Sequence, residues 1–192
     1  MVLVIGLSEN PITVGLVLSL LVYIGIRFSG AHYNPAVTIA MIFRKLISIK
    51  QAFHYIIVQI LGAVLAAFLV YKIKGSFMRV APASTASISQ IVLLEFVLTL
   101  VLIMVILFVA TDKRTKGNVY YGAAIGGTVM LISLIGGGVS GGAFNPAVGL
   151  GPILFESILG VSAATINNFW YYIVGPISGA IIATYVYAIV AD

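Results

Sequence analysis

The chain has 192 residues, of which 61% are hydrophobic and only 8% are charged, and its mean hydropathy is +1.19. A soluble domain needs about a quarter of charged residues to cover its surface, so the composition excludes that class and indicates an integral membrane protein. The net charge of +5 is spread over short clusters between apolar runs, which does not favour nucleic-acid binding, and the absence of cysteine excludes disulfides and thiol chemistry.

Five apolar stretches are long enough to cross a membrane, which takes about 20 residues. In chain order they are residues 12–28, 51–73, 88–110, 119–135 and 168–190. Two more apolar segments, 34–43 and 145–155, are too short to cross, and each begins with Asn-Pro-Ala after a glycine-rich turn. The sequence therefore predicts an all-α integral membrane protein with five full spans and two re-entrant half-helices.

Three loops between these segments carry the basic residues that orient the spans. They hold Arg44, Lys45 and Lys50, then Lys72, Lys74 and Arg79, and then Lys113, Arg114 and Lys116. Two spans separate the first loop from the third, so both lie on one side of the membrane. The excess of positive charge there predicts that this side is cytoplasmic.

The two half-helices belong to a repeated motif. Residues 29–37 read "SGAHYNPAV" and residues 140–148 read "SGGAFNPAV", an offset of 111 positions. Three predicted spans lie between the copies, so the second segment enters from the opposite face. Such an inverted repeat is typical of proteins that transport solutes across membranes. The repeat divides a single membrane domain, residues 1–192, into halves at 1–87 and 88–192.

The Asn-Pro-Ala triplet suits the start of a helix. Asn caps the first helical N–H groups through its side-chain oxygen, Pro fits the first helical position, and Ala lets two helix ends approach closely. Each half-helix directs a partial positive charge towards mid-membrane, where it repels cations and protons. The predicted pore motifs are Asn34, Pro35, Ala36, Asn145, Pro146 and Ala147.

The turns before these triplets are predicted to be irregular backbone at membrane depth, which is tolerated where it lines a water-filled cavity. Their carbonyl groups would offer hydrogen-bond acceptors to a solute. The residues expected to supply these carbonyls are Gly30, Ala31, His32, Gly141 and Ala143.

The paired boxes "SGAHYNPAVTIA" and "SGGAFNPAVGLGP" resemble the signature of the aquaporin, or major intrinsic protein, channels. Glu95 in "LLEFVLTLVLIMVILFVATDKR", Gln59 in "VQILGAVLAA" and the segment "VGPISGA" extend the resemblance along the chain. It implies a right-handed helical bundle, a homotetramer in which every subunit has its own pore, and a place in the cell membrane. It also implies a channel for water and small neutral solutes rather than an enzyme, with no cofactor and no metal.

The sequence departs from this family in two places. The family has a further span before residue 12, and residues 1–11 are too short to provide it. Five spans with a cytoplasmic loop after Asn34 would leave the N-terminus outside, so topology favours a truncated or misassigned start over a true reduced form.

The second departure is Val148, where the family usually has an Arg after the second Asn-Pro-Ala. Counting without gaps from the two Asn residues places the family's narrowest constriction at Val14, Ser133, Gly142 and Val148. This set has no aromatic ring, no His and no fixed cation. It predicts a wider, less polar neck, suited to solutes of the size of glycerol, ammonia or urea.

Four residues allow both a structural and a functional interpretation. Glu95 is expected to hold a re-entrant segment as a buried structural acid rather than contact the solute. His32 is expected to pack as a neutral ring, with gating by protonation as the alternative. Arg27 either lines a vestibule or snorkels at the end of its span, and His54 is expected to pack at the interface.

Three other functions have sequence features that bear on them. Residues 138–142 match the Gly-x-Ser-x-Gly pattern of hydrolases, but no His follows His54 and no strand precedes Ser140. A non-conducting membrane scaffold with the same fold is the main alternative. Coupled transport has less support, because no intramembrane Asp, Glu or Lys other than Glu95 is expected to bind a driving ion.

Overall fold

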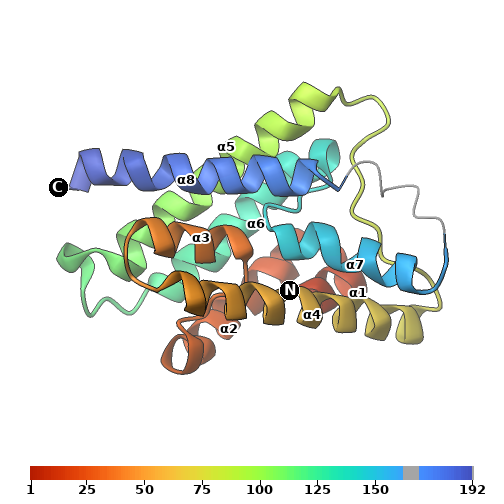
Figure 1. Cartoon of the computed structure of the whole chain (residues 1–192), viewed down its shortest axis with the longest axis horizontal. Coiled ribbons are helices and arrows are strands. Elements are labelled where there is room, and N and C mark those ends of the chain that lie inside the picture. The colour runs from red at the N-terminus through yellow and green to blue at the C-terminus, as the bar shows by residue number, and fades with distance from the viewer. Residues whose placement is uncertain (162–168, 192) are drawn as a thin grey trace.

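The computed structural model describes residues 1–161 and 169–191, and Figure 1 shows them as a bundle of helices. The α-helices are α1 (Val2–Ser8), α2 (Pro11–Ser29), α3 (Pro35–Phe43), α4 (Ile49–Lys74), α5 (Ile88–Ile106), α6 (Tyr121–Ser140), α7 (Pro146–Ile158) and α8 (Tyr171–Ala191). A π-helical stretch, Leu107–Thr111, continues α5, and Lys113–Thr115 forms a 3-10 turn.

All five predicted spans are helices long and apolar enough to cross a membrane, and both predicted half-helices form. The boundaries differ by a few residues: α6 starts two residues later than predicted and continues to Ser140, and α7 continues to Ile158. Residue 168, where the last span was predicted to start, lies outside the described residues. The all-helical membrane fold predicted from the sequence is therefore confirmed.

Local sequence signals set several helix starts. The Asn10 side chain accepts a hydrogen bond from the Ile12 N–H at 2.9 Å, and Pro11 follows it at the first helical position of α2. Helices α4 and α5 both begin with a capping box, in which a Ser and a Gln three residues later satisfy each other's backbone N–H groups.

The bundle is built from packed helix pairs, of which α5 with α8, α2 with α6 and α4 with α7 are the most extensive (Figure 1). Gly15 of α2 and Gly126 of α6 lie at the α2–α6 crossing and are 111 residues apart, the offset of the repeat. A Cβ added to Gly15 would lie 2.6 Å from the Gly126 carbonyl oxygen, so only backbone fits there. This crossing therefore lies close to the axis that relates the two halves.

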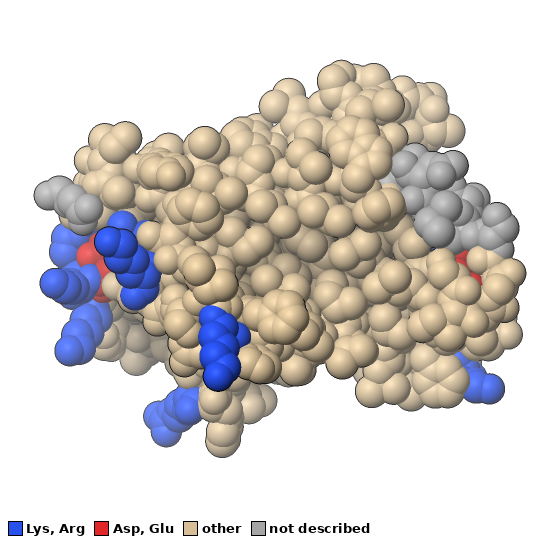
Figure 2. All heavy atoms as spheres, viewed as in Figure 1, with Lys and Arg blue, Asp and Glu red and all other residues tan. Residues whose placement is uncertain are grey.

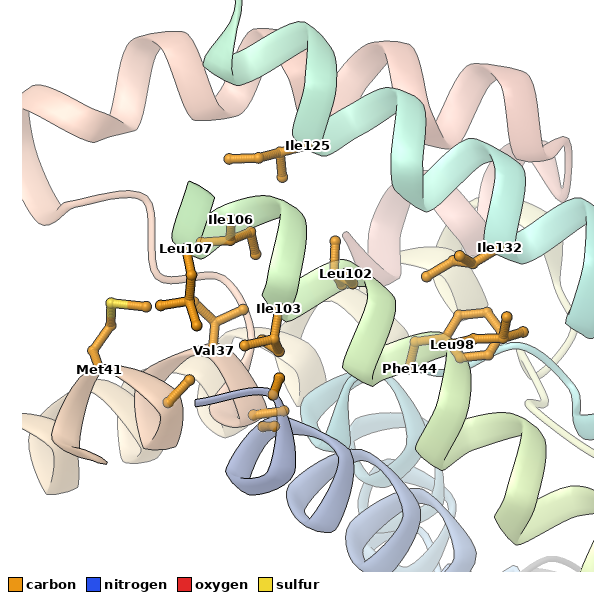
Figure 3. Close-up of a cluster of buried hydrophobic side chains, with 14 of the residues drawn as sticks. Val37, Met41, Leu98, Leu102, Ile103, Ile106, Leu107, Ile125, Ile132 and Phe144 are labelled. Carbon is orange, nitrogen blue, oxygen red and sulfur yellow. The ribbon is translucent and has the colours of Figure 1, made fainter. Parts of the chain in front are cut away.

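The larger apolar cluster of the interior is organised around α5. Leu98, Leu102 and Ile103 of α5 pack with residues of α3, α6 and the second pore loop, as Figure 3 shows. A smaller cluster joins α4 and α7 to the loop that follows α4. Because the second pore loop contributes Phe144 to the larger cluster and Ala143 to the smaller one, helix packing positions residues of the candidate site.

The outer surface is apolar, as expected for contact with lipid. Along α2, Leu16, Leu20, Ile24 and Phe28 are more than half exposed and follow one another at the spacing of one helical turn. Lys and Arg side chains gather at one end of the molecule, where α3, α5 and α8 end (Figures 1 and 2). Arg44 lies over the ring of Tyr187, which packs against Phe108. Arg114 lies over the same Phe108 ring, so the two basic loops lie at the same end, as predicted.

Candidate pore

The two Asn-Pro-Ala boxes meet tip to tip inside the bundle. The Asn34 side-chain amide donates a hydrogen bond to the Phe144 carbonyl at 2.9 Å, and the Asn145 amide donates to the Tyr33 carbonyl at 3.0 Å. Phe144 and Tyr33 each precede the opposite Asn, so the two bonds are equivalents under the 111-residue offset. The inverted repeat predicted from the sequence thus brings both motifs to one place.

Each Asn also caps its own half-helix. The Asn34 Oδ1 atom accepts from the Ala36 N–H at 2.8 Å, and the Asn145 Oδ1 atom accepts from the Ala147 N–H at 2.9 Å. Pro35 and Pro146 occupy the first helical positions. A carboxamide carries two N–H donors, so each Asn retains one N–H beyond its bond to the opposite loop.

The turns that deliver the two Asn residues use left-handed backbone at matching positions. Gly30 and Ala31 have φ values of 65° and 56°, and their equivalents Gly141 and Gly142 have φ values of 88° and 67°. Glycine adopts this region freely, whereas Ala31 does so at a cost of about 1 kcal/mol. The glycines in both copies of the motif are therefore explained by the turn.

Glu95 anchors the second loop from α5. Its Oε1 atom accepts from the Ser140 hydroxyl at 2.8 Å and from the Ala143 N–H at 3.1 Å, and its Oε2 atom accepts from the Phe144 N–H at 2.7 Å. The side chain is completely buried. These bonds fix the loop immediately before Asn145, which is the geometry expected of a structural acid.

Gln59 of α4 lies beside the first loop. Its Nε2 atom donates to the His32 carbonyl and, at 2.9 Å, to the Thr38 hydroxyl. Its Oε1 atom is buried and has no hydrogen-bond partner among the described residues. Tyr55 of α4 also donates to the Ser29 carbonyl at 3.0 Å, so the first loop is held by neutral donors from α4, whereas the second is held by a carboxylate from α5.

A continuous cavity of about 860 Å³ runs past both Asn residues. At the end marked by the basic loops its wall includes Leu46, Ile47 and Thr111, and at the opposite end it includes Pro11, Phe77 and Arg79. The predicted carbonyl-bearing residues all line it, at Gly30, Ala31, His32, Gly141 and Ala143. The described structure thus contains a lumen between the two ends of the bundle.

The four predicted constriction residues come from four elements and all line this cavity. Val14 belongs to α2, Ser133 to α6, Gly142 to the second loop and Val148 to the first turn of α7. Val37, the equivalent of Val148 in the first half, also lines it. The structure brings these side chains to a common lumen, and their role in selecting solutes remains a prediction.

The two histidines, Arg27 and Ser140 also have defined places in the structure. His32 lines the cavity and its ring lies against Tyr55, with 4.9 Å between ring centroids. His54 and Arg27 are exposed, and the His54 Nδ1 atom is 2.7 Å from the Lys50 carbonyl oxygen. The Ser140 hydroxyl is buried and donates to Glu95, so the Gly-x-Ser-x-Gly match forms part of a pore loop.

A second buried acid, which was not singled out in the sequence, accompanies Glu95. Helix α7 continues beyond the predicted end at residue 155 and includes Glu156, which is 1% exposed. Its Oε1 atom accepts from Arg79 Nε at 3.1 Å, so the buried charge has a partner. An isolated Glu directly after an apolar half-helix was the available signal, but only the folded chain shows that Arg79 reaches it.

Comparison with known proteins agrees with this geometry. The family model described as "Major intrinsic protein" matches residues 3–187. Nodulin-26 of Glycine max is 38% identical over 180 residues, and Aquaporin NIP1-1 of Oryza sativa subsp. japonica is 36% identical over 178 residues, each covering 92% of this chain. The solved structure of the aquaglyceroporin from Plasmodium falciparum superimposes with a TM-score of 0.83 at 24% identity, covering 92% of this chain and 79% of that one.

The chain belongs to the major intrinsic protein family and is a multi-pass integral membrane protein. The chain spans 63% of the length of nodulin-26 and 60% of the length of the rice relative. The likeness to the aquaglyceroporin structure supports the fold that the helices and the paired motifs define.

Proposed function

We propose that the chain forms a passive channel for water and small uncharged solutes. The observation that carries the proposal is the reciprocal Asn34–Asn145 arrangement in the wall of a cavity that continues to both ends of the bundle. Each Asn has a remaining amide N–H for a passing solute oxygen, while two helix N-termini disfavour cations. The names of the aquaporin relatives support the same function.

The finer proposal is that the neck is wide and apolar. Val14, Ser133, Gly142 and Val148 include no aromatic ring, no His and no Arg. With only short side chains at these positions, solutes of the size of glycerol, urea or ammonia should pass as well as water. A buried fixed cation is absent from this set, so the half-helix ends would provide much of the cation exclusion.

Reconstitution in proteoliposomes tests both statements. Vesicles with the protein should shrink faster than empty vesicles under an impermeant osmolyte and should re-swell faster in glycerol or urea. Val148→Arg should narrow the passage and lower glycerol permeability about tenfold while retaining most of the water permeability, an effect of about 1.4 kcal/mol on the barrier. Val148→Met is the matched control, because it adds length without charge.

The outcomes separate the two statements. Water and glycerol fluxes equal to those of empty vesicles would overturn the channel. Water flux without glycerol flux in the parent would overturn the wide neck alone. Unchanged selectivity in Val148→Arg would place the constriction elsewhere along the cavity. Because the chain has no cysteine, mercurials should leave every flux unchanged.

A non-conducting scaffold is the second candidate, and one observation favours it. A groove of about 340 Å³ lies beside α4 and shares His32, Asn145 and Val148 with the wall of the cavity. If nothing covers this groove in the membrane, lipid could reach the lumen from the side. Flux measured with residues 1–192, beside flux from a longer form that adds an apolar helix before residue 1, separates these candidates.

The assembly and location are also proposals. We expect a homotetramer in the cell membrane, in which each subunit has its own pore. The mass of the protein–detergent complex, measured by light scattering with the detergent contribution subtracted, should equal four chains. If the mass equals one chain and the same protein conducts in vesicles, the tetramer is overturned and the channel proposal stands.

A further inference from the structure

The loop between α4 and α5, residues 75–87, is attached to the outer mouth of the cavity at successive points. Phe77 stacks on Tyr71 with 4.7 Å between ring centroids and also contacts Phe155 of α7. The Ala83 N–H donates to the Val139 carbonyl at 3.0 Å. The segment between these anchors, residues 77–81, lines the cavity. Its path across the mouth is therefore fixed by packing and hydrogen bonds.

Arg79 lies in the middle of this segment with its charge between a buried acid and the cavity. Its Nε atom donates to Glu156 at 3.1 Å, and the two side chains are 51% and 2% exposed, respectively. A guanidinium has five N–H donors, and the bond to Glu156 uses the one on Nε. The two terminal nitrogen atoms can therefore offer donors to the lumen while Glu156 holds the side chain in place.

The position of this pair relates it to the apolar neck. Glu156 follows Val148 by eight residues of α7, so it lies about 12 Å further towards the outer end of the helix. Among the described residues, the other charged side chain that lines the cavity is Glu9, which is paired with Lys74 at 2.9 Å. A solute entering from this end therefore meets Arg79 before it reaches Val148.

We infer that Arg79, anchored by Glu156, is the charge-selecting residue of the outer mouth, and this inference rests on the proposed channel function. The guanidinium repels small cations before they reach the apolar neck and donates hydrogen bonds to the hydroxyl groups of neutral solutes. The fixed positive charge is therefore on the loop after α4, and not at position 148, directly after the second Asn-Pro-Ala. Glu156 is a positioning residue, because it acts through Arg79.

The test measures potassium leak and glycerol permeability in the same proteoliposomes. Arg79→Gln alone would leave a buried carboxylate unpaired and could prevent folding, so the principal variant is the double change Arg79→Gln with Glu156→Gln. We expect its potassium leak, relative to glycerol permeability, to rise about tenfold, which corresponds to about 1.4 kcal/mol. Arg79→Lys keeps the charge and should stay within about twofold of the parent.

A matched control and a salt series separate charge from shape. Lys72→Gln removes a positive charge from α4, where the ammonium lies over the Phe68 ring, and should leave the leak unchanged. Raising the ionic strength with an impermeant salt to 1 M shortens the screening length to about 3 Å and should shrink the difference between double variant and parent. An unchanged leak in the double variant, or an increase that persists at 1 M, would overturn the inference.

A measurement without flux distinguishes this inference from the channel proposal. In detergent micelles, the ¹⁵N–H signal of Arg79 Nε, identified by its loss in Arg79→Lys, should shift as glycerol is added. If the Arg79 signal shifts but the protein shows no glycerol flux, the channel proposal is overturned and the solute contact at Arg79 stands. If glycerol flux is normal, the Arg79 signal does not shift and the potassium leak of the double variant is unchanged, the role of Arg79 is overturned and the channel proposal stands.

Discussion

Helices α8 and α4 occupy equivalent places in the two halves. They differ in what packs against their small residues. Gly175 and Gly179 of α8 lie against α5, and a Cβ added to Gly175 would lie 2.6 Å from the Glu95 Cβ. On α4 the small residues with the same four-residue spacing are Gly62 and Ala66, and a Cβ added to Gly62 would meet nothing within 4 Å. The same pattern of small residues is thus a helix contact in one half and an open groove in the other.

The difference extends to the pore loops. Both carboxylate oxygens of Glu95 are bonded to the second loop, whereas Gln59 reaches the first loop through Nε2 and leaves Oε1 without a partner among the described residues. Buried polar atoms in folded proteins nearly always have a partner. The comparison shows that α5 both covers α8 and secures the second pore loop, whereas the face of α4 at Gly62 has no such neighbour among the described residues.

The largest expected effect contrasts the two glycines. Gly175→Leu should abolish folding, because the side chain would overlap the backbone and Cβ of α5, while Gly62→Leu should change the melting temperature by no more than about 2 °C. Tryptophan fluorescence of Trp170, the single Trp, reports unfolding in detergent. If Gly62→Leu also abolished folding, the new side chain would have to clash with something that fills the α4 groove in the membrane. The contrast between the two halves would then disappear.

The next effect compares the residues that hold the pore loops. Glu95→Ala leaves the buried Ala143 and Phe144 N–H groups without an acceptor and should lower the free energy of unfolding by about 3 kcal/mol or more. Gln59→Ala should cost about 1 kcal/mol, because it removes two neutral hydrogen bonds at the edge of the groove. Denaturant titration in micelles measures both. Equal losses would contradict the proposed imbalance between the two halves.

Smaller and equal effects are expected at the motif Asn residues, where the halves are alike. Asn34→Ala and Asn145→Ala each remove one helix cap and one reciprocal hydrogen bond, for a loss of about 2 kcal/mol in either case. The melting temperature and the water permeability should both fall, and by similar amounts in the two variants. A loss seen in only one of the two variants would show that the two hydrogen bonds between the pore loops are unequal.

The smallest effect concerns the ion pairs near the helix connections. The Arg114 guanidinium, bonded to Asp112, holds the pKa of that carboxyl well below its usual range. A lowered pKa stabilises the folded state above the unfolded value of about 3.9, and this contribution is lost as the pH falls below it. Arg114→Gln should therefore lower the melting temperature slightly at pH 7, with the difference shrinking below about pH 4.

The exposed pair at the opposite end provides the control for that prediction. Lys74 and Glu9 lie 2.9 Å apart but are 36% and 75% exposed, so Lys74→Gln should have less effect than Arg114→Gln. The comparison is made by following unfolding at several pH values with both variants in parallel. A larger loss in Lys74→Gln would show that the Asp112 pair contributes little.

Much of the fold and part of the site could be predicted from the sequence, because the signals were local. Apolar runs located five spans, and Asn-Pro at positions 34–35 and 145–146 located two half-helices to within about one residue at their starts. Helix C-terminal ends were less accurate, as α7 shows, since apolar composition does not indicate where a buried polar residue such as Glu156 finds a partner. The odd number of spans between the motifs indicated their opposite directions.

By itself, the sequence determined the membrane class, the inverted repeat, the helix caps and the apolar residue at position 148, because each follows from short motifs and apolar runs and from their order along the chain. Only the tertiary structure decided that each Asn amide bonds to the opposite loop, that Glu95 secures three groups of the second loop, and that Arg79 reaches Glu156 across 77 residues. Those contacts depend on how helices pack in three dimensions. No spacing along the chain encodes which loop crosses the mouth of the lumen.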